Sequence, residues 1–388
     1  MKYIKKLKRI IGQLFIAIFN RILVILLPLK EKRVLFLSDV RSELGGNFKA
    51  VYDSLPDDKY EKILLFKKTR NTKRKLKDKF KLVLYLSTSK YIFLEDLVQS
   101  TSHMKVRKGQ KLIQLWHAAG AFKRFGHGRE TSDLKRIHKG YKKYTNVIAS
   151  SEKIRPCYAE AFDVSIDKVK ATGIPRTDIF FDKEYIKNKK EELYNEFQFL
   201  RNKKVILFAP TYRGTQFEEA YYDIEELDLE KIYSIFSKQN YIFIFKWHPF
   251  LYNRIEKEEI KLYDEYKKYP EFYYDLSKER DINDLLLIAD VLITDYSSVI
   301  FDYTFMDKPI VYFTYDYRNY VENGRGLYFP FEDYVYGKVA KNCDELIDAI
   351  KSDSMEENAR NKFFEKFMSA CDGHSTEKVI DWIFKDNL

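Results

Sequence analysis

Short apolar runs that alternate with helix-length polar segments constrain the fold of this chain more than any other feature. In the first half these runs lie at Val34–Ser38, Lys62–Phe66, Leu82–Leu86, Leu112–His117 and Val147–Ser150. In the second half they lie at Val205–Ala209, Tyr241–Trp247, Phe272–Leu276, Val291–Thr294 and Ile310–Phe313. Continuous apolar runs of this length are typical of parallel strands whose sheet is covered on both faces. The pattern predicts an α/β protein with two doubly wound sheets.

The length of the chain also predicts two domains, because 388 residues exceed what one hydrophobic core usually serves. The charged segment Lys183–Lys204 separates the two sets of runs, and we place the boundary there. We expect a first domain over 31–190 and a second over 191–388, which ends in closing helices. Two such domains that face each other would leave a cleft at the carboxyl ends of their strands.

Residues 1–30 combine a basic start with apolar residues at helical spacing. The basic residues are Lys2, Lys5, Lys6, Lys8 and Arg9, and the apolar ones are Ile4, Leu7, Ile11, Leu14, Phe15, Ile18, Ile22 and Ile25. A spanning helix needs about 20 predominantly apolar residues, and Arg21 interrupts this stretch. We therefore expect an amphipathic helix in the membrane interface, where its lysines meet anionic headgroups. A helix buried on the protein's own core is the alternative.

Polar residues interrupt the apolar segment "LITDYSSVIFDY" where its strand should end. Thr294, Asp295, Ser297 and Ser298 would form the turn into a helix that starts near Val299. Ligands bind at the carboxyl ends of strands in such sheets, and a helix N-terminus favours an anion. The segment predicts a phosphate site without a glycine-rich loop, whereas simple helix capping by a serine is the plainer interpretation.

Two further strand ends of the second half carry cationic or imidazole side chains. "YIFIFKWHPF" ends in Lys246 and His248, and "VILFAPTYRG" ends in Thr211 and Arg213. A guanidinium group suits phosphate oxygens. Together the strand ends of this half predict a diphosphate site, although a lone histidine is more often structural.

In the first half, "LIQLWHAAGAFKRFGHG" places His117 directly after a strand, with Lys123 and Arg124 close behind. An imidazole there could take a proton from an attacking hydroxyl, since its unperturbed pKa lies near 6.5. Gly45 and Gly46 follow the first strand and predict a tight turn into a helix near the same edge. The plainer interpretation of His117 is a hydrogen-bonded loop histidine.

Charge and cysteine content narrow the partners and the compartment. The net charge of +11 favours an anionic partner, which leaves nucleic acid, acidic lipid and a phosphorylated substrate open. Cys157, Cys343 and Cys371 are far apart, so no disulfide framework or metal spacing emerges and a reducing cytoplasmic setting fits. No P-loop, HExxH, GxSxG or dinucleotide fingerprint is present. We expect no cofactor and no metal site, although a loosely bound Mg²⁺ on a diphosphate would leave no mark.

These motifs together resemble the CDP-glycerol glycerophosphotransferase family of teichoic-acid synthesis. The matching segments are "LWHAAGAFK", "APTYRG", "FKWHP", "ITDYSSVIFDY" with "KPIVYF", and "DGHSTEKV", in family order. The family more often has Gly where Ala118 stands and Ser where Thr294 stands.

The resemblance implies a GT-B-like fold of two Rossmann-like domains and a monotopic enzyme on the cytoplasmic face of the cell membrane. It implies transfer of a polyol phosphate from a CDP-activated donor to a hydroxyl of a polyprenyl-diphosphate-linked acceptor in wall teichoic acid synthesis. Glycerol phosphate is the polyol phosphate that we expect before others. His117 would be the general base, and His248 would stabilise charge on the donor diphosphate. The remaining donor-side residues would be Thr211, Arg213, Lys246, Thr294, Asp295, Ser297, Ser298 and Asp302, and the acceptor-side residues Gly45, Gly46, Lys123 and Arg124.

Other functions stay open at this point. A nucleotide-sugar glycosyltransferase of cell-surface polysaccharide synthesis has the same two-domain build, and a basic nucleic-acid binder or a non-catalytic membrane scaffold also fits the charge. Aromatic residues that lie inside apolar runs favour core over exposed stacking platforms, so we expect no nucleic-acid partner. Whether the donor carries glycerol or ribitol, and whether one unit or many are added, is left open by the sequence.

Overall fold

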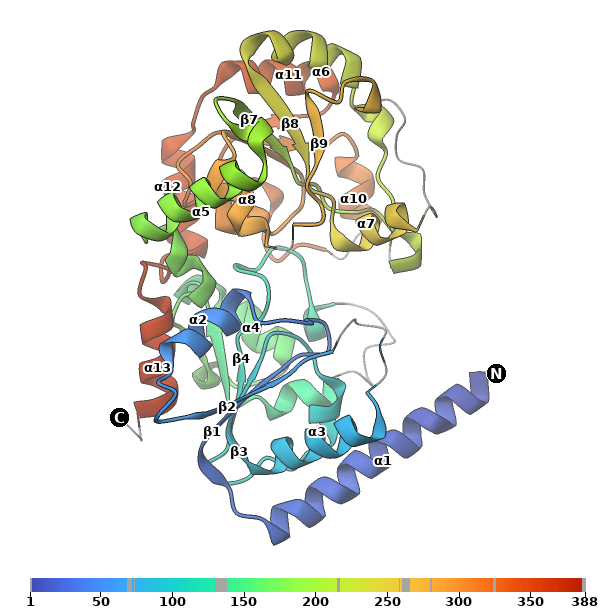
Figure 1. Ribbon diagram of the computed structural model, residues 1–388, viewed down its shortest axis with the longest axis vertical. Coiled ribbons are helices and arrows are strands. Elements are labelled where there is room, and N and C mark those ends of the chain that lie inside the picture. The colour runs from blue at the N-terminus through green and yellow to red at the C-terminus, as the bar shows by residue number, and fades with distance from the viewer. Residues whose placement is uncertain are drawn as a thin grey trace. The chain divides into compact units, whose positions relative to one another are not determined.

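The computed structural model describes residues 2–67, 72, 74–129, 138–214, 217–257, 259, 266–279, 281–323 and 326–385. The chain forms two compact units, and each is described by itself (Figure 1). Unit 1 comprises Met1–Asp178 together with Ser369–Leu388, and unit 2 comprises Ile179–Met368.

A six-stranded parallel sheet with the order β2-β1-β3-β4-β5-β6 forms the centre of unit 1. Its strands are β1 (Lys30–Leu37), β2 (Glu61–Leu65), β3 (Ser89–Leu94), β4 (Lys111–Gln114), β5 (Asn146–Ala149) and β6 (Val169–Ala171). The side chains of 34–37 and 91–94 are fully buried, as expected for strands covered on both faces. The strand order reverses between β1 and β3, which is where ligands bind in such sheets.

The helices of unit 1 are α1 (Lys2–Leu26), α2 (Gly46–Ser54), α3 (Leu76–Thr88), α4 (Arg155–Phe162) and α13 (Ser375–Phe384). Helix α13 comes from the far end of the chain and lies beside α2 (Figure 1). The carboxylate of Asp178 accepts hydrogen bonds from the N–H groups of Ser375 and Thr376 at 2.9 and 2.7 Å. The ring of Phe384, fully buried, lies 4.2 Å from that of Tyr91 on β3.

The predicted strand at Leu82–Leu86 is wrong, because these residues belong to α3. Leu82, Val83 and Leu86 are buried at helical spacing, and the strand that follows is β3. Two apolar runs follow each other here, at 82–86 and at 91–94, and only the second forms a strand of the sheet.

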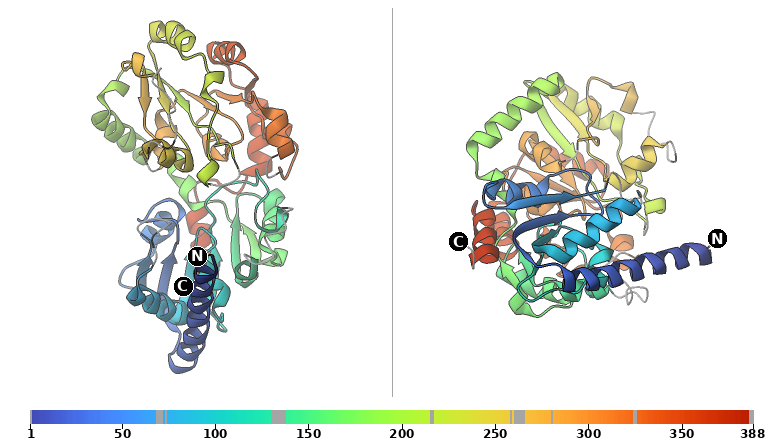
Figure 2. Two further views of the ribbon diagram at one scale, coloured as in Figure 1. Left: turned by 90° about the vertical axis from the view of Figure 1, so that its right-hand side faces the viewer. Right: turned by 60° about the horizontal axis from the view of Figure 1, so that its bottom comes forward.

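Helix α1 lies along α3, as Figures 1 and 2 show. Phe15 and Phe19 pack against Phe80 of α3, with ring centroids 5.0 and 5.6 Å apart. Asn20, also fully buried, donates to Ser87 Oγ at 2.9 Å and accepts from Lys105 N at 2.7 Å. One face of α1 is therefore bound to unit 1.

The opposite face of α1 exposes a stripe of apolar side chains, namely Ile11, Leu14, Ile18, Ile22 and Ile25. Among the helices that the structure describes, none has the length and apolarity needed to cross a bilayer.

Unit 2 is built on a second parallel sheet, with the order β12-β11-β10-β7-β8-β9. Its strands are β7 (Lys204–Phe208), β8 (Tyr241–Phe245), β9 (Tyr273–Asp275), β10 (Val291–Thr294), β11 (Ile310–Phe313) and β12 (Lys338–Ala340). This is the strand order of the Rossmann fold, and it reverses between β7 and β10. The prediction of two parallel α/β sheets is confirmed.

The helices of unit 2 are α5 (Lys183–Glu196), α6 (Leu229–Phe236), α7 (Pro249–Glu256), α8 (Ile282–Ile288), α9 (Val299–Tyr303), α10 (Tyr317–Asn323), α11 (Cys343–Ser352) and α12 (Glu357–Phe367). The core around β7 and β8 is aromatic, with Phe208, Phe243, Phe245 and Trp247 in contact. The helix expected near Val299 is present as α9. Closing helices expected for the second domain are present as α11, which contains "DELIDAIKS", and α12, which contains "NARNKFFEKF".

The extents of the two units differ from the predicted domains at both ends of unit 2. Unit 2 begins at Ile179, so α5 belongs wholly to it rather than to the boundary. The last residues return to unit 1, where the predicted range 191–388 had placed them with the second domain. The physical reason is the apolar face of α13, where Phe384 packs against Tyr91 of β3 and against Tyr60, which directly precedes β2.

Candidate active site

The backbone at the end of β4 turns sharply and presents His117. Trp116 has a φ of 55°, a left-handed conformation that is strained for a bulky residue. Its N–H donates to Gln114 Oε1 at 2.9 Å, and its carbonyl accepts from Asn47 Nδ2 at 2.8 Å, so the turn is held from both sides. The His117 side chain is 53% exposed. Strain of this kind is often retained where a side chain must be aimed.

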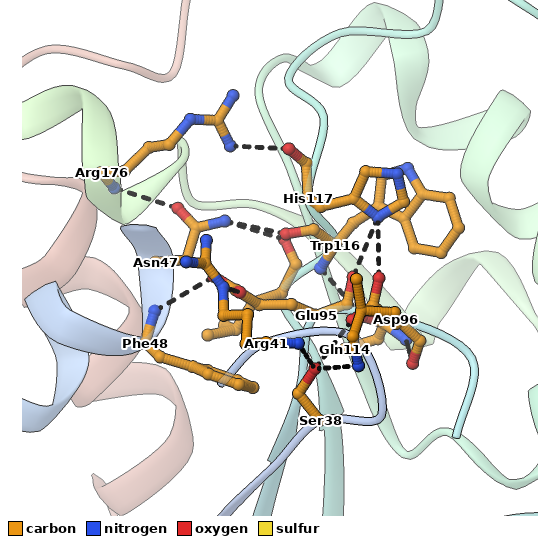
Figure 3. A network of polar contacts seen from close by, with 12 residues as sticks. Ser38, Arg41, Asn47, Phe48, Glu95, Asp96, Gln114, Trp116, His117 and Arg176 are labelled. Carbon is orange, nitrogen blue, oxygen red and sulfur yellow. Dashed lines mark hydrogen bonds and ion pairs between the residues drawn. The ribbon is translucent and has the colours of Figure 1, made fainter. Parts of the chain in front are cut away.

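Figure 3 shows two contacts that converge on one ring nitrogen of His117. Nδ1 lies 3.1 Å from the carbonyl oxygen of Glu95 and 3.4 Å from Asp96 Oδ1. The other carboxylate oxygen of Asp96 accepts from Ser38 Oγ at 3.0 Å. These partners follow β3 and β1, so the site lies at the reversal point of the first sheet.

The contact with Asp96 shifts the pKa of both side chains. Desolvation lowers the pKa of His117. The hydrogen bond and negative charge of Asp96 raise it and outweigh the desolvation, so the pKa lies above its ordinary value. Burial raises the pKa of the Asp96 carboxyl group, but the hydrogen bond and charge of His117 and the hydrogen bond from Ser38 bring it below its ordinary value. The pair therefore favours the ionised carboxylate and strengthens the imidazole as a base.

A buried ion pair lies beneath the predicted glycine turn. Glu95 is 1% exposed, and its carboxylate pairs with Arg41 and accepts from the N–H of Phe48 at 3.2 Å. Burial raises the pKa of Glu95, and the charge of Arg41 opposes this. Gly46 has a φ of 56°, and a Cβ atom there would lie 2.3 Å from Arg41 Nη2. The glycine therefore leaves room for the guanidinium group at the start of α2.

Asn47 and Arg176 complete this network. The N–H of Arg176 donates to Asn47 Oδ1 at 3.0 Å, and its Nη1 donates to the carbonyl of His117 at 3.2 Å (Figure 3). Both ends of the His117 peptide segment are thus tied, to Asn47 of α2 at Trp116 and to Arg176, which follows β6, at His117.

The basic residues after His117 lie on the loop that packs against α4. Arg124 Nη1 is 3.6 Å from Glu160 Oε1, and the Arg124 side chain is 37% exposed. Lys123 is partly buried in the same loop. Gly126, with a φ of 56°, allows this loop to approach the carbonyl of Ala161 closely.

In unit 2, Arg213 is enclosed rather than open to a ligand. Its Nη1 donates to Asp295 Oδ2 at 2.8 Å, and its Nε and Nη2 donate to the two oxygens of Asp316 at 2.6 and 2.9 Å. The Arg213 side chain is 5% exposed. Four tyrosine rings surround the guanidinium group at 5.1 to 5.5 Å, those of Tyr222, Tyr296, Tyr315 and Tyr320. Its contacts do not support the prediction that it holds phosphate oxygens.

Other predicted donor-side residues also serve the framework. Asp295 accepts from Thr211 N at 2.8 Å, which joins the ends of β10 and β7. Thr294 is fully buried and donates to the carbonyl of Ala209 at 2.7 Å. Asp302 is 4% exposed within α9.

Ser297 and Ser298 are the partly exposed residues of this turn. Ser297 Oγ accepts from Val299 N at 3.4 Å, whereas Ser298 occupies the N-cap position of α9 without a side-chain capping bond. Capping therefore does not account for Ser298.

His248 lies at the start of α7, beyond the end of β8. Its Nδ1 accepts from the N–H of Phe250 at 3.2 Å, which places the proton of the neutral ring on Nε2. The ring of Tyr212 lies 4.7 Å away. Lys246 is 6% exposed and donates to the carbonyl of Ser277 at 3.2 Å, and burial lowers its pKa.

The structure also assembles residues that the sequence did not single out. Ser38, Arg41, Glu95 and Asp96 surround His117, and Asp316 completes the Arg213 network. The signal for Glu95 and Asp96 was their place directly after a buried apolar run, but the wrong strand at 82–86 concealed it. Within the part of the chain that the structure describes, no group of three His, Cys, Asp or Glu residues is arranged to hold a metal ion.

Residues 18–385 match the model of the CDP-Glycerol:Poly(glycerophosphate) glycerophosphotransferase family. The chain is 40% identical to a teichoic acid poly(ribitol-phosphate) polymerase of Bacillus spizizenii over 92% of its length, but spans only 57% of that protein. It is 32% identical to a teichoic acid ribitol-phosphate primase of the same organism, covering 94% of this chain and 93% of the primase. Relatives named for glycerol phosphate are 28 to 30% identical.

The fold is similar to that of the wall teichoic acid polymerase TagF. The TM-score is 0.75 at 20% identity, over 99% of this chain and 97% of the TagF chain. Because the identity is low, this likeness concerns the fold alone. The match of the family model over nearly the whole chain shows that this protein belongs to the CDP-glycerol:poly(glycerophosphate) glycerophosphotransferase family.

Proposed function

We propose that this chain transfers a polyol phosphate from a CDP-activated donor to a hydroxyl group of an acceptor in wall teichoic acid synthesis, and releases CMP. The observation that carries the proposal is the half-exposed His117 ring, held by Asp96 and the Glu95 carbonyl at the reversal point of the first sheet. Membership of the family supports the reaction class. A TagF structure described as soaked with CDPG supports a CDP-linked donor.

In the proposed step, His117 Nε2 takes the proton of the acceptor hydroxyl. The hydroxyl oxygen forms a bond to the phosphorus that bears the polyol, and the bond from that phosphorus to the bridging oxygen breaks. The electron pair stays on the bridging oxygen, which leaves as part of CMP, and the imidazolium returns its proton to solvent. Such a reaction needs alignment and neutralisation of spreading negative charge more than covalent catalysis.

The donor diphosphate is assigned to unit 2. His248 offers its Nε2–H as a hydrogen-bond donor, since Nδ1 accepts from Phe250. Ser297 and Ser298 are the hydroxyl groups at the end of β10 that are partly exposed. We assign Thr211, Arg213, Thr294 and Asp295 to the framework that holds these groups, because their contacts are internal. The proposal thus gives His117 the proton of the acceptor hydroxyl and gives His248 the charge on the donor diphosphate.

Ribitol phosphate is the proposed polyol. The expectation of glycerol phosphate as the polyol phosphate is not confirmed. Relatives named for ribitol phosphate are 32 to 40% identical to this chain, whereas those named for glycerol phosphate have a lower identity. This chain is similar both to polymerases and to a primase. The product masses in the experiment below therefore determine how many units are added.

Peripheral attachment to the cytoplasmic face of the membrane is proposed from the exposed face of α1. Its apolar stripe lies opposite the face that is bound to α3, and the sequence before it is basic. Apolar and basic residues in this arrangement favour the interface of an anionic membrane. Such a position would bring the enzyme to a polyprenyl-diphosphate-linked acceptor.

Incubation of the chain with CDP-ribitol, CDP-glycerol or UDP-sugars and a soluble acceptor analogue tests the proposal by the nucleotide released. CMP release with CDP-ribitol, with product masses that increase by ribitol phosphate units, is expected. Release of UDP instead would favour the glycosyltransferase alternative, and CMP release with CDP-glycerol alone would reverse the polyol assignment. Arms with Mg²⁺ and with EDTA test the expectation that no resident cofactor is needed.

A further inference from the structure

We propose that Asp96 is a positioning residue that keeps a proton on Nδ1 of His117, so that Nε2 is the nitrogen that accepts the proton in the reaction. The inference rests on the proposed function, because it states how the base of that reaction is prepared. It concerns a residue outside the motifs that the sequence singled out.

The partners of His117 Nδ1 determine the tautomer. Both are acceptors, the Glu95 carbonyl at 3.1 Å and Asp96 Oδ1 at 3.4 Å, and an acceptor is satisfied only if Nδ1 carries hydrogen. In the neutral ring the lone pair is then on Nε2, the nitrogen that does not take part in the contacts drawn in Figure 3. The same logic orients the histidine of hydrolase triads, where a carboxylate holds the ring and is not itself protonated.

Ser38 fixes the orientation of the Asp96 carboxylate. Its Oγ accepts hydrogen bonds from the N–H groups of Val40 and Arg41, both at 3.0 Å, so both lone pairs of the hydroxyl are used. The Ser38 O–H must therefore donate, and it donates to Asp96 Oδ2 at 3.0 Å. Oδ1 is left facing His117.

Several charged groups surround the ring, and Asp96 is the one placed to act on it. Glu95 follows the same strand, but Arg41, from the loop after β1, pairs with its carboxylate. Arg176, which follows β6, donates to the His117 carbonyl rather than to the ring. The upward shift of the His117 pKa agrees with this assignment, since Asp96 is its main cause on the raising side.

Asp96→Asn is the first test, with kcat measured against pH by CMP release. Since the Ser38 O–H still donates, the new amide turns its carbonyl toward Ser38 and its NH₂ group toward Nδ1. This NH₂ group favours the tautomer with a lone pair on Nδ1, whereas the Glu95 carbonyl favours the tautomer with hydrogen there. Whichever tautomer results, the negative charge of Asp96 is lost. We expect kcat to fall by roughly 10²-fold or more, in line with the worth of a positioned base. A base acts when deprotonated, so a lower His117 pKa should move the acid limb of the profile to lower pH.

Ser38→Ala provides the matched variant. Combined with Asp96→Asn, it removes the donor that orients the amide, which can then turn its carbonyl toward Nδ1. We expect the double variant to be more active than Asp96→Asn alone, and Ser38→Ala alone is measured beside them as the baseline for the second substitution. A purely structural role for Asp96 predicts the opposite, since the second substitution would add to the damage.

The tautomer itself can be measured without any turnover. Long-range ¹H–¹⁵N spectra of the full chain with ¹⁵N-labelled histidine separate protonated from unprotonated ring nitrogens, and His117→Gln assigns the signal among the six histidines. A wild-type signal with hydrogen on Nδ1 supports the inference, and hydrogen on Nε2 overturns it. An unshifted acid limb with full kcat in Asp96→Asn also overturns it. If wild type releases no CMP from any CDP-polyol, the proposed function fails while the spectra still decide the tautomer.

Discussion

His117 and Arg213 illustrate how the surroundings of a charged or titratable residue determine its use. His117 follows a strained turn and is half exposed, and its Nδ1 is held by Glu95 and Asp96, which follow β3. Arg213 follows a strand in the same way but is buried between two carboxylates. The sequence pattern of the two sites is alike, so only the partners distinguish a candidate catalytic group from a framework group.

Arg213→Met should destabilise unit 2 strongly. The substitution leaves the carboxylates of Asp295 and Asp316 buried without their cation, and breaking a buried pair in this way costs about 3–5 kcal/mol. Chemical denaturation measures the loss of unfolding free energy. Arg124→Met is the control, because its pair with Glu160 is partly exposed and should contribute about 0–1 kcal/mol. Unchanged stability with weakened donor binding in Arg213→Met would instead restore its predicted role at the phosphates.

At the scale of elements, the sequence predicted most strands because a strand covered on both faces must be apolar throughout. It failed at Leu82–Leu86, where buried residues at helical spacing formed a local run that imitates a strand. It also missed β6 and β12, since short strands that are partly exposed leave no continuous run. The turn after β10 was located correctly, but the partners of its residues come from other strands and could not be read locally.

Helix α1 offers a test at the same scale. Ile18→Glu places a charge on the exposed stripe and should reduce cosedimentation with anionic vesicles, since burying one such side chain contributes roughly 1.5–3 kcal/mol. The expected loss of affinity is about tenfold or more. Gln13→Glu, which adds the same charge outside the stripe, is the control. Equal binding by both variants would show that the stripe does not meet the membrane.

For the whole molecule, the return of the last residues to unit 1 is the feature that the sequence could not predict. Helix α13 has an apolar face that fits either sheet on composition alone, and only the packing of Phe384 on Tyr91 and Tyr60 decides between them. The extent of each unit therefore depends on contacts between the two ends of the chain.

Phe384→Ala should loosen unit 1 and leave unit 2 intact. Removing a fully buried phenylalanine costs about 3–5 kcal/mol, so hydrogen exchange should accelerate in β1 and β3. Phe367→Ala is the matched variant, since Phe367 is equally buried but packs on Tyr334 in unit 2. Faster exchange in the strands of unit 2 after Phe384→Ala would contradict the assignment of α13.

CMP release from CDP-ribitol, measured for wild type and His117→Ala with a soluble acceptor analogue, tests whether His117 is the base of the proposed transfer. Removing a positioned base should lower kcat by about 10²–10⁴-fold while far-UV circular dichroism stays unchanged. Wild type should release CMP, and the variant should lose nearly all of this release. Near-normal release by a folded His117→Ala protein would contradict this role of His117.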